Sequence, residues 1–242
     1  MRSRYRSLSK RETKSRLIPG RANISSGPIN IQSHSRILGI DESGKGDFFG
    51  PLVIAGVLTD NAAARRLKDH GVRDSKKISD NRILELDRLI SANFIHSIVI
   101  IGPEKYNQLY SRIRNLNKLL AWGHSRVIEN IAENNAIDLA VSDKFGRTDF
   151  IENALMKKGK SIELRQEVRA EAVIQVAAAS ILARAGFIRY MNKLSKLYDT
   201  ELPKGAGSIV DKAAAAIAQK YGREALDKIA KLHFKNYKKV LG

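Results

Sequence analysis

Residues 37–58, ILGIDESGKGDFFGPLVIAGVL, decide the fold of this chain. Two short apolar runs flank a glycine-rich turn, which is the pattern of two paired β-strands. The first run ends in the adjacent acids Asp41 and Glu42, and the turn carries Lys45 between two glycines. Carboxylates at the end of a buried strand are costly unless a cation meets them there. The stretch therefore predicts both a strand pair and a cation site at its end.

Beyond this stretch, helical and extended patterns alternate along the chain. Helical spacing covers residues 62–71, 79–93, 102–110, 115–135, 148–159 and 171–198, and extended patterns cover residues 94–101, 137–143 and 161–168. Further helices are expected after the loop at residues 202–208. Strands that alternate with helices predict an α/β domain, with a mixed β-sheet flanked by helices and additional helices at its C-terminal end.

The composition points to a polyanionic partner. The 242 residues carry a formal net charge of +18, with a pI of about 10.1. Such a charge favours nucleic acid as the partner, with a ribosome-associated or merely basic protein as the alternative. The chain has no cysteine, which excludes disulfides and thiolate metal sites. No apolar run is long enough to span a bilayer, so no membrane association is expected.

Residues 1–36 differ from the rest of the chain. They hold nine Lys/Arg against the single acid Glu12, a net +8 that leaves +10 for residues 37–242. This Arg/Ser-rich composition predicts a mostly disordered basic arm in front of a single catalytic domain over residues 37–242. The arm is interpreted as nucleic-acid-binding, with an organellar transit peptide as the alternative. The chain is accordingly expected in the cytoplasm, or in an organelle if the alternative holds.

Two further acids sit where they can join the first pair. Asp143 ends the apolar run at residues 137–143, and Glu171 opens the helical pattern at residues 171–198. Asp41, Glu42, Asp143 and Glu171 could converge, and four such carboxylates repel one another unless divalent cations neutralise them. Oxygen-only ligation favours Mg²⁺ or Mn²⁺, and paired ions of this kind serve phosphoryl transfer. Taken singly, the acids have alternatives: a strand-end salt bridge, a turn acid or a first-turn helix acid.

The Gly-Lys-Gly turn is not a phosphate-binding P-loop, because the spacing of that motif is missing. Glycines often only make turns. The functional interpretation is that Gly44 and Gly46 let the backbone approach a phosphate or sugar while Lys45 supplies charge. Lys76, Lys77 and Lys204 are comparable candidates in other loops, although a solvated surface is the common fate of a single lysine. Lys45 is then not expected to be the salt-bridge partner of the acids.

The helical pattern at residues 115–135 supplies two more candidates, and the preceding one supplies a third. Asn117 and His124 lie at helical spacing with Leu120, so they share a face, and Asn107 precedes them. His124 is expected either inside the core or at the surface, or facing the site and hydrogen-bonded to nucleic acid.

Several motifs in the same order resemble the type 2 ribonucleases H: GIDESGKGDFFGPLVIAGV, DSKKIS, SDKFG, AEAVIQVAAASILAR and LPKGAG. Within that family the resemblance to ribonuclease HIII is greatest, because of GKGDFFGP, the glutamate as fourth acid and the NLNKLLAWGH segment. The resemblance covers about residues 37–242. It implies an RNase H-like fold and endonucleolytic cleavage of the RNA strand of RNA/DNA hybrids, leaving 5′-phosphate and 3′-hydroxyl ends.

The resemblance also implies roles for individual residues. Asp41, Glu42, Asp143 and Glu171 would be the catalytic acids and would bind Mg²⁺ or Mn²⁺, two ions per site, with Glu167 as the fallback for the fourth acid. The turn would read the ribose 2′-hydroxyl, which distinguishes RNA from DNA. The candidate substrate-binding residues are Ser43, Gly44, Lys45, Gly46, Ser75, Lys76, Lys77, Asn107, Asn117, His124, Lys144 and Lys204.

Two departures from the family pattern shape the expected activity. Ribonucleases HIII usually carry an N-terminal domain resembling the TATA-binding protein, for which the 36 residues here are too few. Ala206 stands where ribonuclease HII has a tyrosine used at an RNA–DNA junction. Stretches of ribonucleotides are therefore the expected substrate of a monomer with no obligate protein partner. The alternatives are a ribonuclease HII-like enzyme cutting at single ribonucleotides, and a non-catalytic nucleic-acid-binding protein.

Overall fold

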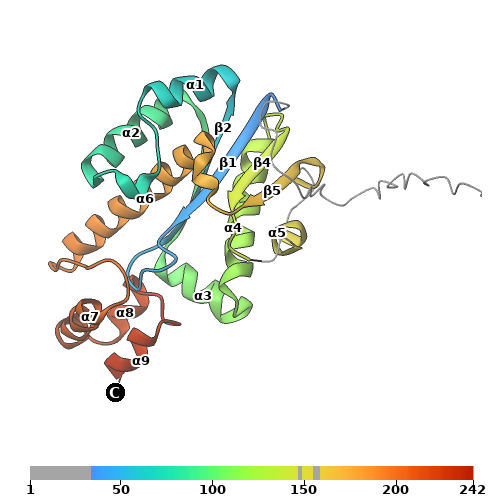
Figure 1. The fold of residues 1–242 in the computed structure, drawn as a ribbon. Helices are drawn as coiled ribbons and strands as arrows, with labels where there is room; N and C mark the ends of the chain where they lie inside the picture. The colour runs from blue at the N-terminus through green and yellow to red at the C-terminus, as the bar shows by residue number, and fades with distance from the viewer. Residues whose placement is uncertain (1–33, 147–148, 155–158, 242) are drawn as a thin grey trace, which may run out of the picture.

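A computed structural model describes residues 34–146, 149–154 and 159–241. Its centre is a five-stranded mixed sheet of order β3-β2-β1-β4-β5 (Figure 1). The strands are β1 (Arg36–Ser43), β2 (Leu52–Asp60), β3 (Ile95–Ile101), β4 (Leu139–Asp143) and β5 (Glu163–Glu167). β2 runs antiparallel to both β1 and β3, whereas β4 is parallel to β1 and to β5.

Helices pack on both faces of this sheet. The long helix α6 (Ile174–Leu197) lies against β1 and β2 on one face, with α1 (Asn61–Asp69) and α2 (Asp80–Asn93) beside it. On the other face are α4 (Leu116–Ala132) and, packed on it, α3 and α5. The remaining elements are α3 (Pro103–Ile113), α5 (Asp149–Ala154), α7 (Ser208–Tyr221), α8 (Glu224–Ile229), α9 (Lys235–Leu241) and the 3₁₀ turns η2 (Ser75–Lys77), η3 (Gly159–Ser161) and η4 (Ala170–Ala172).

The alternation of side chains along β2 separates two hydrophobic cores. Val53 and Val57 belong to the core beneath α6, while Leu52 and Ile54 belong to the core beneath α4. Because successive strand residues point to opposite faces, a fully buried strand needs apolar residues at almost every position. This is why β2 reads as a continuous apolar run, and it shows that the strand lies between two layers.

Gly39 brings α6 directly against β1. A Cβ at this position would lie 2.2 Å from backbone atoms of Gln175 and Val176, closer than any side chain could be accommodated. The alanine-rich start of α6 has small side chains on its inner face, so helix and strand backbones can approach each other. The same close approach brings the first turns of α6 to the carboxyl end of β1.

The last three helices, α7 to α9, form a group at the carboxyl end of β1 (Figure 1). The loop between β1 and β2 is bonded into this group. Gly50 N donates to Ile229 O at 2.8 Å, and Lys231 N donates to Phe48 O at 2.8 Å. Phe48 N in turn donates to Gly205 O at 2.9 Å. The C-terminal helices thus support the loop that carries the Gly-Lys-Gly turn.

The expected α/β architecture, with its mixed sheet and additional C-terminal helices, is confirmed. One local expectation is wrong: Glu171 does not open the long helix but lies in η4, and α6 begins at Ile174 after an extended Val173. Arg36, placed in the arm by composition, is the first residue of β1, and Asp138 Oδ2 accepts from the backbone N–H of Ser35 and Arg36. The predicted disorder of residues 1–33 lies outside the described residues.

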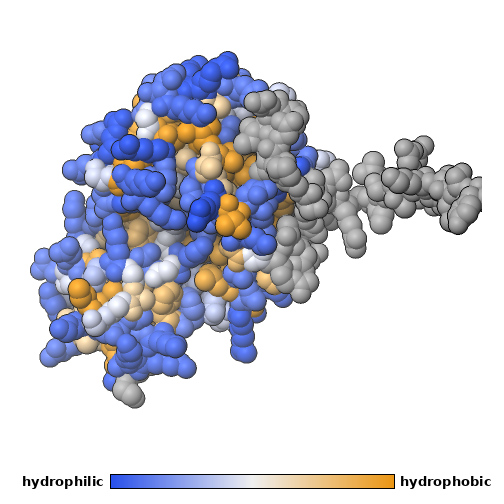
Figure 2. All heavy atoms as spheres, viewed as in Figure 1, coloured by the Kyte–Doolittle hydropathy of each residue, from blue (hydrophilic) through white to orange (hydrophobic). Residues whose placement is uncertain are grey.

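In the described ranges, none of the helices has the length and apolar character needed to cross a membrane. The surface seen in Figure 2 is mostly hydrophilic, with small scattered hydrophobic patches.

Candidate active site

The two adjacent acids at the end of β1 point to opposite faces of the sheet. Leu38 and Ile40 belong to the core beneath α4, so Glu42, at the same parity, faces α4. Asp41 has the parity of Gly39 and faces α6. Strand alternation therefore explains why neighbouring carboxyl groups have different partners although both reach one pocket.

Glu42 is held by the side chains of His124 and Lys45. Its Oε2 lies 3.1 Å from His124 Nε2 on α4, and its Oε1 accepts from Lys45 Nζ at 2.7 Å. The Glu42 side chain is only 3% exposed, whereas that of Lys45 is 47% exposed. Burial alone would raise the pKa of Glu42, but the hydrogen bond and charge of His124, together with Lys45, lower it to about 2. Glu42 is consequently a carboxylate in the fold.

Asp41 lies in the opposite electrostatic situation. Burial, and then the nearby charges of Glu42 and Asp143, raise the pKa of Asp41 to about 8, against the opposing effects of the Glu42 N–H and Lys45. Asp143 is close because β4 is parallel to β1 and Ile40 pairs with Ser142, so the residues that follow lie side by side. The carboxyl group of Asp41 is thus short of a cation in the protein alone.

These acids line a pocket of about 370 Å³ at the carboxyl end of β1 and β4. All four predicted catalytic acids are among its lining residues. The full lining is Asp41, Glu42, Ser43, Lys45, Asp74, Ser75, Lys76, Asp143, Glu171, Val176, Ser180, Arg184 and Lys204. Glu167, the fallback for the fourth acid, is paired in register with Asp143 but does not line the pocket. The geometry therefore favours Glu171.

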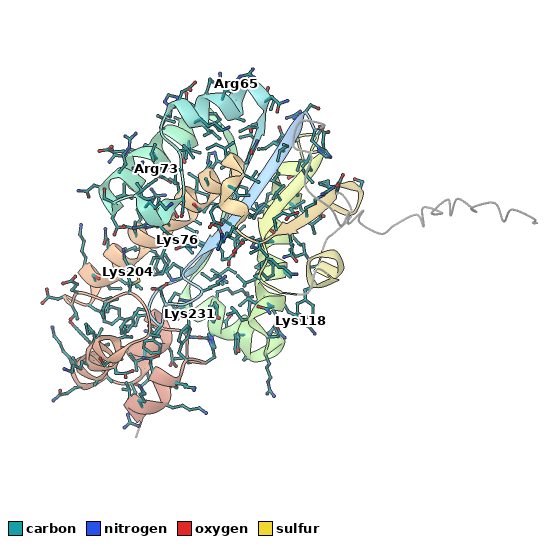
Figure 3. All side chains as sticks on the ribbon, viewed as in Figure 1. Arg65, Arg73, Lys76, Lys118, Lys204 and Lys231 are labelled. Atoms are coloured by element: carbon teal, nitrogen blue, oxygen red, sulfur yellow. The ribbon has the colours of Figure 1, made fainter. Side chains whose placement is uncertain are left out.

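Arginine and lysine side chains form the opposite wall of the pocket. Asp80 accepts from Arg184 Nη2 at 2.7 Å and from Lys204 Nζ at 2.6 Å, and Arg184 Nη1 also donates to the carbonyl of Ser75. Figure 3 shows Lys76 and Lys204 on the same side of the end of β1. This network joins η2, α6 and the loop at residues 202–208 into one cationic edge.

The sequence reasoning missed Arg184 and Asp80. The signal was present for Arg184, because Val176, Ser180 and Arg184 recur every four residues along α6 and all line the pocket. For Asp80 there was none, since a helix-start acid is usually explained by the helix dipole alone.

Three predictions need correction. Lys45 is an ion-pair partner of Glu42, contrary to the expectation. His124 is completely buried and bonded to Glu42, so it cannot reach a nucleic acid. Asn107 lies away from the pocket, and its amide is occupied by the backbone of the C-terminal segment: it donates to Ala230 O at 2.9 Å and accepts from Leu232 N at 3.1 Å.

The remaining predicted substrate-binding residues surround the pocket at different depths. Gly44 has φ of +90°, and a Cβ there would lie 2.2 Å from Pro51 O, so the turn requires glycine, while Gly46 is exposed with open space around it. Lys77 and Lys144 are exposed but do not line the pocket. Asn117 contacts Gly146 instead, since a Cβ on that glycine would lie 3.0 Å from Asn117 Nδ2.

The pocket suits a hard divalent cation by its chemistry. Its acids offer only oxygen donors. Burial and acidic neighbours disfavour the charged form of Asp41, and a bound cation would compensate that charge. Within the described ranges, no three Asp, Glu or His side chains already surround one point closely enough to hold an ion. The donors therefore fit the ion by type and charge, and binding would draw them together.

The fold as a whole matches solved ribonucleases H. The structure titled Bst-RNase HIII in complex with Mn²⁺ matches with a TM-score of 0.80 and 34% identity, over 86% of this chain and 69% of that one. Aquifex aeolicus RNase H3 matches with a TM-score of 0.69 and 29% identity, over 82% of this chain and 72% of that one. The class defined by the fold and the acidic pocket is the ribonucleases H.

Sequence comparison identifies the family. The family model described as Ribonuclease HII matches residues 38–237. Ribonuclease HIII of Chlamydia pneumoniae is 47% identical over 222 residues, which cover 88% of this chain and 74% of the relative. Ribonuclease HIII of Protochlamydia amoebophila is 44% identical over 88% of this chain and 70% of the relative. The chain belongs to the type 2 ribonuclease H family, and the resemblance to ribonuclease HIII is confirmed.

Proposed function

We propose that this chain is an endonuclease that hydrolyses the RNA strand of RNA/DNA hybrids with the help of two divalent ions, leaving 5′-phosphate and 3′-hydroxyl ends. Family membership supports the reaction class. The observation that carries the metal-dependent chemistry is the pocket in which Asp41, buried and short of a cation, meets Glu42, Asp143 and Glu171.

One group of residues in the pocket would bind the ions, and a second group would bind the substrate. Bound divalent ions would supply an activated water and stabilise the departing 3′ oxygen. Asp41 and Asp143, side by side at the ends of β1 and β4, would share these ions, with Glu42 and Glu171 completing their surroundings. His124 fixes the orientation of Glu42 from below through its hydrogen bond.

The cationic edge would hold the hybrid. Lys76 and Lys204 are exposed beside the pocket, and Arg184 lines the same pocket. Lys45 is tied to Glu42 in the protein alone. Its exposed side chain would become available to a phosphate once an ion takes over the charge of Glu42. Gly46 leaves the backbone of the turn open to the ribose, where the 2′-hydroxyl marks RNA.

Either Mg²⁺ or Mn²⁺ suits an all-oxygen pocket. The structure of Bst-RNase HIII was solved in complex with Mn²⁺, and this supports Mn²⁺ as a cofactor of the present protein. We propose that the protein is a monomer. Its basic arm would add electrostatic affinity for the hybrid, because neutralised phosphates release counterions.

Deletion of residues 1–33, rather than 1–36, tests the arm, since Arg36 belongs to β1. The deletion removes eight Lys/Arg and Glu12, a loss of +7. We expect weaker hybrid binding and a shallower dependence of affinity on salt, with the cleavage rate at saturation preserved. An unchanged salt slope would refute this role.

The activity is tested with four labelled substrates: an RNA/DNA hybrid, duplex DNA, duplex RNA and a DNA duplex with one embedded ribonucleotide. Each is incubated with Mg²⁺, Mn²⁺ or EDTA, and Asp143→Asn serves as the matched control for contaminating nucleases. We expect metal-dependent cleavage of the hybrid, little cleavage at a single ribonucleotide, and none in EDTA or by Asp143→Asn. Hybrid binding without cleavage in any metal would identify a non-catalytic nucleic-acid-binding protein instead.

A further inference from the structure

A buried lysine on the far side of the Gly-Lys-Gly turn has no part in the chemistry above. Lys231, in the segment between α8 and α9, is completely buried. Its Nζ donates to the carbonyl oxygens of Asp47 and Gly50, both at 2.8 Å, and of Phe49 at 3.4 Å. The three carbonyls belong to the loop between β1 and β2, directly after Gly46. Figure 3 shows Lys231 where this loop meets the C-terminal helices.

The number of bonds indicates that Lys231 acts as an ammonium ion. An ammonium group has three N–H donors, and the loop offers three carbonyl acceptors. A neutral amine has one donor fewer and would leave a buried carbonyl without a partner, which is costly. The ring of Tyr106, whose centroid lies 5.7 Å from Nζ, adds a further favourable contact for a cation. Burial opposes these contacts and lowers the pKa of Lys231 to about 7.

The loop is bound to the same segment through its backbone as well. Phe48 O accepts from Lys231 N at 2.8 Å, and Phe49 forms an isolated β-bridge with Ala230. The loop's own side chain Asp47 accepts from Gly205 N at 2.6 Å. Residues 47–50 are therefore fixed on one side by the segment at 229–231, while the turn at 44–46 faces the pocket on the other side.

Helix α3 holds the segment in place from behind. Asn107 donates to Asp227 O at 3.3 Å and to Ala230 O at 2.9 Å, and accepts from Leu232 N at 3.1 Å. His233 stacks on Tyr110 of α3, with ring centroids 4.2 Å apart. The contacts form a continuous series from α3 through the segment at 227–233 to the loop and the Gly-Lys-Gly turn.

We propose that Lys231 is a positioning residue for the hybrid-binding turn: its ammonium group gathers three carbonyls of residues 47–50 and so sets the position of Gly44, Lys45 and Gly46 at the pocket. Asn107 supports it by fixing the segment that carries it. This inference rests on the proposed function, since it assigns a purpose to the position of a turn that contacts the hybrid.

The absence of cysteine from the chain allows the ammonium group itself to be tested. Lys231→Cys is alkylated in denaturant with 2-bromoethylamine, which restores a side chain of lysine length ending in an ammonium group. A second sample is alkylated with 1-bromopropane, which gives the same length ending in a methyl group. Both are refolded beside wild-type protein taken through the same steps. The two samples differ at one atom position, so any difference between them reports the ammonium group.

Three quantities are measured well below the melting temperature of each sample. They are hybrid affinity in Ca²⁺ without turnover, kcat and KM in Mg²⁺, and hydrogen exchange of the loop amides. We expect the aminoethyl protein to approach wild type. The propyl protein should bind hybrid on the order of tenfold more weakly, with faster exchange at residues 47–50, because a small displacement of a binding loop is costly. Leu67→Ala, a buried change in α1, which lies apart from the C-terminal helices in Figure 1, is the control for lost stability alone.

Equal affinity and kcat/KM in the two alkylated proteins would overturn the inference, even if their melting temperatures differ, because Lys231 would then be only structural. If neither refolds, Asn107→Ala gives the answer. Weaker hybrid binding at unchanged fold, relative to Leu67→Ala, supports positioning, and wild-type binding contradicts it. Failure of wild type to cleave hybrid would instead count against the proposed function.

Discussion

Asp41 and Lys231 are ionisable groups on either side of the loop between β1 and β2, and the protein compensates their charges to opposite extents. Asp41 faces the pocket with acidic neighbours that raise its pKa to about 8, so its negative charge is poorly compensated by the protein. Lys231 is completely buried, whereas Asp41 is partly exposed at the pocket, and every N–H of the Lys231 ammonium group meets a carbonyl. An uncompensated charge in a pocket is available to a ligand, whereas a fully compensated charge stabilises structure. The difference separates the part of the site that binds ions from the part that holds its shape.

The largest effect is expected from neutralising the uncompensated charge. Asp41→Asn should reduce cleavage of the hybrid on the order of a thousandfold, because an ion ligand is lost. In EDTA the same variant should be more stable than wild type, on the order of 1 kcal/mol, because a repelling buried carboxyl is removed. Single-turnover cleavage and urea unfolding measure the two effects. Retained activity, or a loss of metal-free stability, would contradict the assignment of Asp41 as an uncompensated ligand.

Removing the compensated charge should have the opposite sign for stability. Lys231→Met keeps the length of the side chain but leaves three buried carbonyls without donors, so the free energy of unfolding should fall by about 2–4 kcal/mol. Urea unfolding at pH 6, where the wild-type lysine is charged, gives the value. A variant as stable as wild type would show that the carbonyls find other partners and would remove the contrast with Asp41.

A smaller effect is expected at the group that orients Glu42. His124→Leu removes the bond to Glu42 Oε2 from a position that never touches solvent, so about tenfold more Mg²⁺ or Mn²⁺ should be needed for half-maximal activity. His124→Gln, which restores an N–H donor on a side chain of similar reach, should recover part of the loss. Metal titrations of cleavage rate make the measurement. Identical titrations for both variants and wild type would exclude this orienting role.

The smallest effect is a change in the titration of His233. Burial, and then the charge of Lys231, lower the pKa of His233 to about 4. Lys231→Met removes the second cause, so this pKa should rise by about one unit or less. The unfolded chain binds a proton between pH 4 and 6.5 that folded His233 does not, so the His233 contribution makes stability rise with pH across that window. In Lys231→Met, the pH range over which His233 makes stability rise with pH should begin at a higher pH and end at the same pH as before.

Proton NMR of the His233 ring follows this titration directly. Leu67→Ala serves as the control, because it alters packing in α1 without changing the charge beside His233. An unchanged His233 pKa in Lys231→Met would mean that Lys231 is already neutral in the wild-type fold.

The acids of the site were predictable because they follow a local pattern. Asp41, Glu42 and Asp143 each end an apolar run, and parallel strands bring such ends to one edge of a sheet. The alternation along β1 even implies that Asp41 and Glu42 face opposite layers. The cationic edge was predictable in part, since Lys76 and Lys204 lie in glycine- or serine-containing loops. The ion pairs of Asp80 with Arg184 and Lys204, which link its elements, were not predictable.

The support behind the loop left no local signal. Asn107 was interpreted as a substrate contact, whereas its partners lie 120 or more residues later. His124 was left open between core, surface and site, and it proves to be a core residue that contacts Glu42, one of the predicted catalytic acids. A side chain's partner across the fold depends on packing between distant elements, which neither periodicity nor composition encodes.

The bond between Lys231 and Asp47 joins residues 184 positions apart. During synthesis, β1 and β2 leave the ribosome before Lys231, so the carbonyls of their connecting loop meet the lysine only after the intervening residues have been made. Domains that depend on such distant contacts complete their folding late. A nascent or C-terminally truncated chain would therefore present the acids of the pocket without a fixed hybrid-binding turn. The position of the Gly-Lys-Gly turn is thus set only after residue 231 has been made.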